Sequence, residues 1–239
     1  MDYSSLISKM LFVLYHTYNM FGKIINMMYE NLVDLLFPKE ESVKILEKME
    51  VDEIYNKFPP AKDISTNFKA IFSYKYPLCK TAIWEIKYKA NKIILKKFSS
   101  ILYEILLEEM SDIMLFNGGQ KLILIPVPGD KKRLKEKGFN QSALLVQKIF
   151  EIDGGKNFEI DLNVLEKIKE TEHQVKVKNR WKRLENLIGC FAVKDSALIK
   201  GKNFIVIDDV ITTGATMTET ERALKEGGAK NVYGFSIAH

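Results

Sequence analysis

The sequence predicts an α/β fold in which a mostly parallel, twisted sheet is flanked by helices and preceded by an N-terminal helical extension. Three observations predict this class. Short runs rich in branched apolar residues recur after position 120, helical patterns separate these runs, and a long apolar stripe at helical spacing occupies the first 37 residues. Strands that alternate with helices indicate crossover connections and therefore parallel pairing. We expect two parts, a helical region over residues 1–80 and the sheet domain over residues 81–239.

The composition is that of an ordinary globular protein. The chain has 239 residues, of which 46% are hydrophobic and 28% charged, and this excludes collagen-like, mucin-like and wholly disordered classes. Cys79 and Cys190 form no CxxC pair and no histidine cluster accompanies them, so we expect a cytoplasmic protein without a disulfide framework or a zinc site. The net charge of +5 gathers in two clusters, Lys131–Lys137 and Lys167–Arg183, which are candidate contacts for a polyanion.

The N-terminal stripe places apolar residues at alternating steps of four and three from Ile7 to Leu35. This heptad-like pattern predicts a helix that ends before Pro38. Its longest uncharged stretch, Met10–Gly22, is shorter than the about 20 apolar residues of a membrane span, so we expect no span and no signal peptide. The first expectation is that the stripe packs on the chain's own domain, the second is self-association into a homo-oligomer, and the third is a membrane surface or another partner.

The remaining elements are predicted in chain order. The charged segment from Lys39 to about Phe72 is expected to be a small helical connector, and apolar residues at helical spacing from Ala82 to Phe116 predict one or two amphipathic helices. Strands are expected at Leu122–Val127, Phe158–Leu165, Phe204–Ile207 and Asn231–Ile237, and helices at Phe139–Phe150 and Thr216–Glu226.

The most informative motif runs from Phe204 to Thr216, where a buried strand leads into Asp208 and Asp209 and then into a short loop before a helix. Gly214 and Ala215 let an anion approach the backbone closely, and the threonines of this loop add hydroxyl donors. Thr216 and Glu219 have the spacing of a capping box, which predicts that the helix starts at this loop. A helix N-terminus attracts phosphate, and the Walker and dinucleotide-binding motifs are both absent. Two carboxylates beside a phosphate site suit a sugar phosphate that binds with a divalent cation.

The run VIDDVITTGAT, from Val206 to Thr216, resembles the phosphoribosyl pyrophosphate (PRPP) motif of type I phosphoribosyltransferases. Two further segments resemble the ComF-type competence members of that group. They are IPVP at Ile125–Pro128 followed by RLKEKGFNQ at Arg133–Gln141, and KETEHQ at Lys169–Gln174 followed by RLENLIGCF at Arg183–Phe191. Members commonly carry an LLFP segment that leads into a four-cysteine zinc ribbon. Here Leu35–Pro38 is present but Lys39-Glu40-Glu41 follows, so we predict no zinc.

This resemblance implies a type I phosphoribosyltransferase-like fold and a Mg²⁺-dependent transfer of the 5-phosphoribosyl group of PRPP to a nitrogen acceptor, with release of pyrophosphate. By the same resemblance, the 5′-phosphate is bound by Thr212, Thr213, Gly214, Ala215 and Thr216. The ribose and Mg²⁺, directly or through water, are held by Asp208 and Asp209. Pyrophosphate is bound by Val127, Pro128, Arg133 and Lys137, and the flap or acceptor contacts are Thr171, His173 and Gln174.

Two positions refine these roles. Neighbours on a strand point in opposite directions, so one acid is expected to support the loop, and we favour Asp208 for the direct sugar contact. Thr212 stands where many purine-base transferases have an acid, which disfavours a purine base and leaves an exocyclic amine, ammonia or another acceptor open.

An alternative hypothesis keeps the fold and the phosphate loop but no turnover. It is a PRPP-sensing or DNA-uptake accessory protein whose basic surface contacts single-stranded DNA. The basic runs contain few aromatic residues, Phe139 and Trp181, so the sequence shows no stacking platform for bases.

Overall fold

The computed structural model describes residues 39–239 except 63, 117–119 and 170–186. It also leaves undescribed the side chains of five helical residues, Lys39, Glu40, Phe116, Lys131 and Arg133. The chain divides by contacts into Met1–Lys44 and Ile45–His239, and the description below concerns the second unit. The helix expected over the first 37 residues lies outside the described residues. The flap positions Thr171, His173 and Gln174 also lie outside them.

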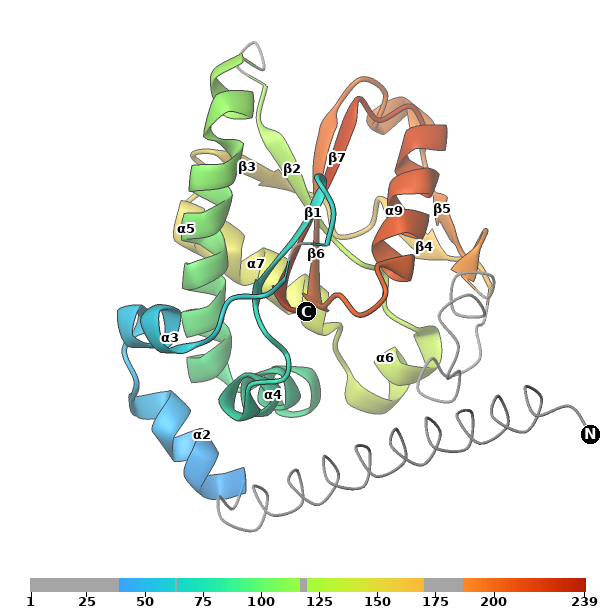
Figure 1. The fold of residues 1–239 in the computed structure, drawn as a ribbon. Helices are drawn as coiled ribbons and strands as arrows, with labels where there is room; N and C mark the ends of the chain where they lie inside the picture. The colour runs from blue at the N-terminus through green and yellow to red at the C-terminus, as the bar shows by residue number, and fades with distance from the viewer. Residues whose placement is uncertain (1–38, 63, 117–119, 170–186) are drawn as a thin grey trace, which may run out of the picture. The chain divides into compact units, whose positions relative to one another are not determined.

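A five-stranded sheet forms the centre of this unit, and Figure 1 shows its strands side by side. In spatial order the strands are β1 (Phe68–Phe72), β7 (Asn231–Ala238), β6 (Asn203–Val210), β2 (Leu122–Pro126) and β3 (Phe158–Ile160). Every neighbouring pair is parallel. The strands β4 (Leu165–Lys167) and β5 (Phe191–Val193) form a separate antiparallel pair. The predicted α/β class with a mostly parallel sheet is confirmed.

Helices cover both faces of the sheet. Two of them, α5 (Lys92–Phe116) and α7 (Gln141–Asp153), lie on one face, and α9 (Ala215–Glu226) lies on the other (Figure 1). At the carboxyl ends of the strands lie α4 (Pro77–Trp84), the π-helical turn η1 (Glu85–Lys89) and α6 (Lys131–Lys137). The other elements are α2 (Lys39–Lys48), α3 (Val51–Lys57) and the 3₁₀ turn η2 (Ser196–Leu198). Ligands of parallel α/β sheets bind at the carboxyl ends of the strands, so this end is where the site is sought.

Two expected segments differ from the structure, and the strand β5 and the helix α6 were not expected from the sequence. The presumed helical connector contains the strand β1, whose Phe68 and Phe72 are buried while Lys69 pairs with Glu109 of α5. The single strand expected over Phe158–Leu165 is wrong, because the chain turns at Asp161. Its carboxylate accepts the N–H of Asn163 at 2.8 Å, and this local turn separates β3 from β4.

The core is built from branched residues of the strands and from aromatic side chains between β1, α3 and α5. The rings of Phe58 and Phe72 lie 5.2 Å apart between centroids, and Phe98 lies 6.0 Å from both. Gly234 of β7 lets other side chains approach closely, because a Cβ there would stand 2.8 Å from the ring of Phe68. Within the described ranges, none of the helices combines the length and the hydropathy of a membrane span.

Candidate functional site

Asp208 and Asp209 lie at the carboxyl end of β6, and their carboxylates have different hydrogen-bond and ion-pair partners. Asp208 is half-buried, and its Oδ1 accepts the hydroxyl of Ser142 at 2.9 Å and the N–H of Asp209 at 2.9 Å. Ser142 lies in the first turn of α7, behind the N-cap Asn140. Asp209 is 3% exposed, and its Oδ2 lies 3.2 Å from the ammonium of Lys87 without a hydrogen bond of good geometry.

The charges of this cluster shift each other's protonation equilibria. Burial raises the pKa of Asp208 well above its usual value, and the adjacent charge of Asp209 acts in the same direction, while Lys87 and Ser142 oppose them. Burial alone would lower the pKa of Lys87. The two carboxylates outweigh burial and raise that pKa, so the lysine stays charged. The site therefore contains the charged ammonium of Lys87 beside the carboxyl groups of Asp208 and Asp209.

The predicted phosphate loop follows the acids directly. Ile211 donates its N–H to the carbonyl of Ala238 at 2.9 Å, and Gly214 takes a left-handed conformation with φ 79° as the N-cap of α9. The Thr213 hydroxyl accepts the N–H of Ala215 at 3.4 Å. Thr212 is exposed, whereas Thr213 and Thr216 are half-buried. Hydroxyl groups and the first N–H groups of a twelve-residue helix thus gather beside the acid pair, as expected for an anion site.

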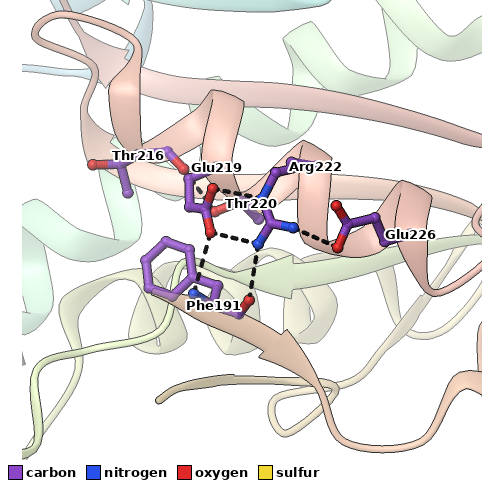
Figure 2. Close-up of polar contacts among 6 residues, drawn as sticks. All are labelled: Phe191, Thr216, Glu219, Thr220, Arg222 and Glu226. Atoms are coloured by element: carbon purple, nitrogen blue, oxygen red, sulfur yellow. Dashed lines mark hydrogen bonds and ion pairs between the residues drawn. The ribbon is translucent and has the colours of Figure 1, made fainter. Parts of the chain in front are cut away.

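The predicted capping box is wrong. The helix begins at Ala215 rather than after Thr216, so Thr216 lies inside the first turn. Glu219 faces away from that turn, as Figure 2 shows, and its carboxylate accepts Arg222 at 2.7 and 2.8 Å and the N–H of Phe191 at 3.4 Å. The glutamate joins α9 to β5, because a buried carboxylate gains more from a guanidinium than from one backbone N–H.

The second candidate loop, Val127–Asp130, leaves β2 beside the first one, since β2 and β6 are neighbours in the sheet. Val127 donates its N–H to Ile207 at 3.0 Å, and its carbonyl accepts Asn140 Nδ2 at 3.0 Å. Gly129 leaves room for this contact, because a Cβ at position 129 would stand 3.3 Å from Asn140 Cγ. Parallel strands therefore bring both predicted binding loops to one edge of the sheet.

The basic residues expected at the Val127–Asp130 loop take different positions. Lys137 donates to the carbonyl of Lys87 at 3.2 Å and stands 4.0 Å from the ring centroid of Tyr88. Lys167, from β4, pairs with Asp130 at 2.9 Å. Arg133 belongs to α6, and its side chain is outside the described part. The structure thus brings the acids and both loops together, and it places Lys137 against η1.

Sequence reasoning missed two members of this cluster, Lys87 and Ser142. Lys87 is one of many lysines on an amphipathic pattern, and Ser142 follows an ordinary helix cap, so neither residue type stands out. Both meet the acids only through tertiary packing, because Ser142 is 66 positions away from Asp208. The prediction of a helix start near Asn140 was the one available signal.

Comparison with known proteins places the fold in a known class. Residues 143–236 match the model of the phosphoribosyl transferase domain. The fold and the two loops thus define a protein of the phosphoribosyltransferase-like class.

The relatives identify the family within that class. Competence protein ComFC of Streptococcus pneumoniae is 32% identical over 174 residues, which cover 73% of this chain and 69% of the relative. The chain belongs to the ComF-type family. The DNA utilization protein YhgH of Escherichia coli O157:H7 is 30% identical over 109 residues, 46% of this chain and 45% of that protein.

A solved structure of an allosteric regulatory enzyme of purine biosynthesis aligns with a TM-score of 0.38 and 16% identity, covering 64% of this chain and 29% of that one.

Proposed function

We propose that this protein is a PRPP-dependent phosphoribosyltransferase with a nitrogen acceptor. The observation that carries the proposal is the acid pair of Asp208 and Asp209 immediately before a glycine-capped helix N-terminus, with the Val127–Asp130 loop alongside. Few other ligands would use all three features together. A phosphate suits the helix N-terminus, ribose hydroxyls suit a carboxylate, and a diphosphate suits the second loop.

In the proposed reaction the bond from the anomeric carbon to pyrophosphate breaks, and pyrophosphate leaves with the bonding electrons. A nitrogen of the acceptor bonds to that carbon and loses a proton. The residues of this chain bind and orient. The loop from Thr212 to Thr216 would hold the 5′-phosphate, Asp208 would accept ribose hydroxyls, and the Val127–Asp130 loop would meet the charge that develops on pyrophosphate.

Mg²⁺ fits this donor set as a cation that arrives with the substrate. Within the described residues no three His, Cys, Asp or Glu side chains form a metal-binding group. Mg²⁺ in proteins is commonly held by one or two carboxylates together with substrate phosphates, and Asp208 is the half-buried carboxylate at the right place. When bound, the ion would neutralise charge on the diphosphate.

Isothermal titration of PRPP in the presence of Mg²⁺ tests the proposal. We expect saturable binding by the wild type and by Asp112→Asn, an exposed acid on α5, and binding weaker by about 10–150-fold in Asp208→Asn. Release of pyrophosphate in the presence of candidate amines or ammonia would then identify the acceptor. A folded wild type that does not bind PRPP would refute the proposal, and binding without turnover would favour a PRPP sensor.

A second candidate function, contact with single-stranded DNA, is favoured by an aromatic pair that the fold places near the basic helix α6. The rings of Trp84 and Tyr88 lie 5.4 Å apart and are 39% and 52% exposed. Lys89 stands 4.9 Å from the Trp84 ring and Lys137 4.0 Å from the Tyr88 ring. Proteins that bind single-stranded nucleic acids use exposed aromatic rings to stack on bases and nearby lysines to contact phosphates.

Fluorescence anisotropy with a labelled oligothymidylate tests this candidate. Trp84→Ala/Tyr88→Ala should weaken binding by at least about 5–150-fold, the range for one lost base stack, and Tyr74→Ala should not. Affinity should fall steeply as salt rises. Equal affinity of the double variant and the Tyr74→Ala control would remove this candidate.

A further inference from the structure

The turn that delivers Lys87 to the acid pair has an unusual backbone. η1 is a π-helical turn, and it ends at Ala90 in a left-handed conformation with φ 48° and ψ 41°. A residue with a Cβ rarely adopts that conformation, so the surrounding contacts must maintain it. π-Turns inside helical segments are found frequently at functional sites. The backbone of η1 is therefore a candidate functional feature.

Buried polar contacts hold η1 in place. Glu85 is 3% exposed, and its carboxylate accepts Lys89 at 2.9 Å and Asn91 Nδ2 at 3.3 Å. Asn91 in turn caps α5 by accepting the N–H groups of Ile93 and Ile94. The carbonyl of Lys87 is bound by Lys137 of α6. The backbone that carries Lys87 is thus fixed from both α5 and α6.

The side chain of Lys87 is 26% exposed and ends at Asp209, not at Asp208. Asp208 already has the Ser142 hydroxyl and one N–H on Oδ1. Oδ2 of Asp209 is buried, lacks a hydrogen bond of good geometry, and lies 3.2 Å from the ammonium. The two neighbouring carboxylates therefore differ in exposure and in partner before any ligand binds.

We propose that Lys87 is a positioning residue that gives the two acids different roles. It fixes Asp209 inside the protein as an ion pair and leaves Asp208 as the carboxylate that contacts the sugar. This inference rests on the proposed function, because the sugar is that of PRPP. Two adjacent carboxylates repel each other strongly at low dielectric, and the ammonium beside the more buried acid offsets this repulsion.

Titration of PRPP with Mg²⁺ into a set of variants tests the division of roles. Asp208→Asn should lose about 10–150-fold in affinity, the cost of hydrogen bonds to a charged group. Lys87→Met should weaken binding by at least about tenfold because Asp209 then faces Asp208 without a counter-ion. Lys87→Arg should retain most of the affinity, and Lys96→Met, an exposed lysine on α5, should match the wild type.

The double variant Lys87→Met/Asp209→Asn provides the decisive comparison. It removes the whole ion pair, leaves no buried unpaired charge, and so should both fold and bind PRPP more tightly than Lys87→Met alone. Circular dichroism and thermal melting establish that each variant is folded. Two results would overturn the proposed roles. The first is a loss of PRPP affinity in the double variant equal to the product of the losses in Lys87→Met and Asp209→Asn. The second is a loss in Asp209→Asn equal to that in Asp208→Asn.

Ribose 5-phosphate, which lacks the pyrophosphate, serves as the second probe. If Lys87 acts through the acids, Lys87→Met should reduce the affinities of ribose 5-phosphate and PRPP by the same factor. A loss confined to PRPP would instead place the ammonium on pyrophosphate and overturn the inference while the proposed function stands. A folded wild type that binds neither probe would refute the proposed function, and the inference with it.

Discussion

Removal of Arg222 should destabilise the protein measurably, because the buried carboxylate of Glu219 would lose the cation that it pairs with. Glu219 is 4% exposed, and Figure 2 shows its contacts with Arg222 and with the N–H of Phe191. Without Arg222, the contact with the Phe191 N–H, at 3.4 Å, would remain. Breaking a fully buried ion pair costs about 3–5 kcal/mol. Arg222 is 34% exposed, so water replaces part of the lost contact and we expect about 2–3 kcal/mol for Arg222→Met.

Thermal unfolding followed by circular dichroism measures this effect. At about 2–4 °C per kcal/mol for a domain of this size, Arg222→Met should lower the midpoint by about 4–12 °C. Glu226→Gln is the matched control, since Glu226 pairs with the same arginine but is 65% exposed. It should change stability by less than about 1 kcal/mol. Equal midpoints for Arg222→Met and Glu226→Gln would refute the reasoning.

The pH dependence gives a second check on the same network. Burial acts to raise the pKa of Glu219, but the Arg222 hydrogen bonds and the N–H of Phe191 outweigh it and hold the pKa below the usual 4.5. A pKa that is lower in the folded state adds stability above the unfolded value, and that stability is lost as pH falls through the folded value. The advantage of the wild type over Glu219→Gln should thus be full at pH 7 and shrink below pH 4.5. An advantage that grows on acidification would contradict the assignment.

Three further predictions concern the fold and the loops. Gly234→Ala should cost about 1–3 kcal/mol in unfolding free energy, because its Cβ would stand 2.8 Å from the Phe68 ring, and chemical denaturation would show it. Gly214→Ala meets no atom within 4 Å but strains a backbone at φ 79°, so about 1 kcal/mol should be lost; no loss would mean that the loop relaxes freely. Ser142→Ala removes the hydroxyl that lowers the pKa of Asp208. If PRPP binding needs the ionised carboxylate, the pH midpoint of PRPP affinity should therefore move upward. An unchanged midpoint would show that the hydroxyl does not act on Asp208.

The fold was largely predictable because its signals are local. The strands β2, β6 and β7 are apolar runs long enough to be read directly, and the helices between them have clear periodicity. β1 was missed because five residues at a sheet edge, with an exposed Lys69 among them, look no different from a short helical pattern. The split between β3 and β4 depends on one side chain, Asp161, which closes a turn on its own backbone.

The candidate site was predictable to the extent that it is continuous in the chain. Asp208 to Thr216 is such a segment, in which a strand, a loop and a helix follow one another. The contacts of the acids are not local, since Lys87 reaches Asp209 from η1 and Ser142 reaches Asp208 from α7. Such contacts depend on how helices pack against the sheet, and no spacing rule encodes them.

The contacts of Lys87 also link the two loops that are expected to hold opposite ends of the substrate. The Val127–Asp130 loop leads directly into α6, and Lys137 of that helix binds the carbonyl of Lys87. Lys87 then binds Asp209, next to the predicted phosphate loop. If Lys137 bound pyrophosphate directly, as its position in the sequence implied, its ammonium would have to leave both Tyr88 and η1. We therefore expect Lys137 to support the turn that carries Lys87, and under the proposed function η1 would connect the loop expected to bind pyrophosphate with the acids expected to bind ribose.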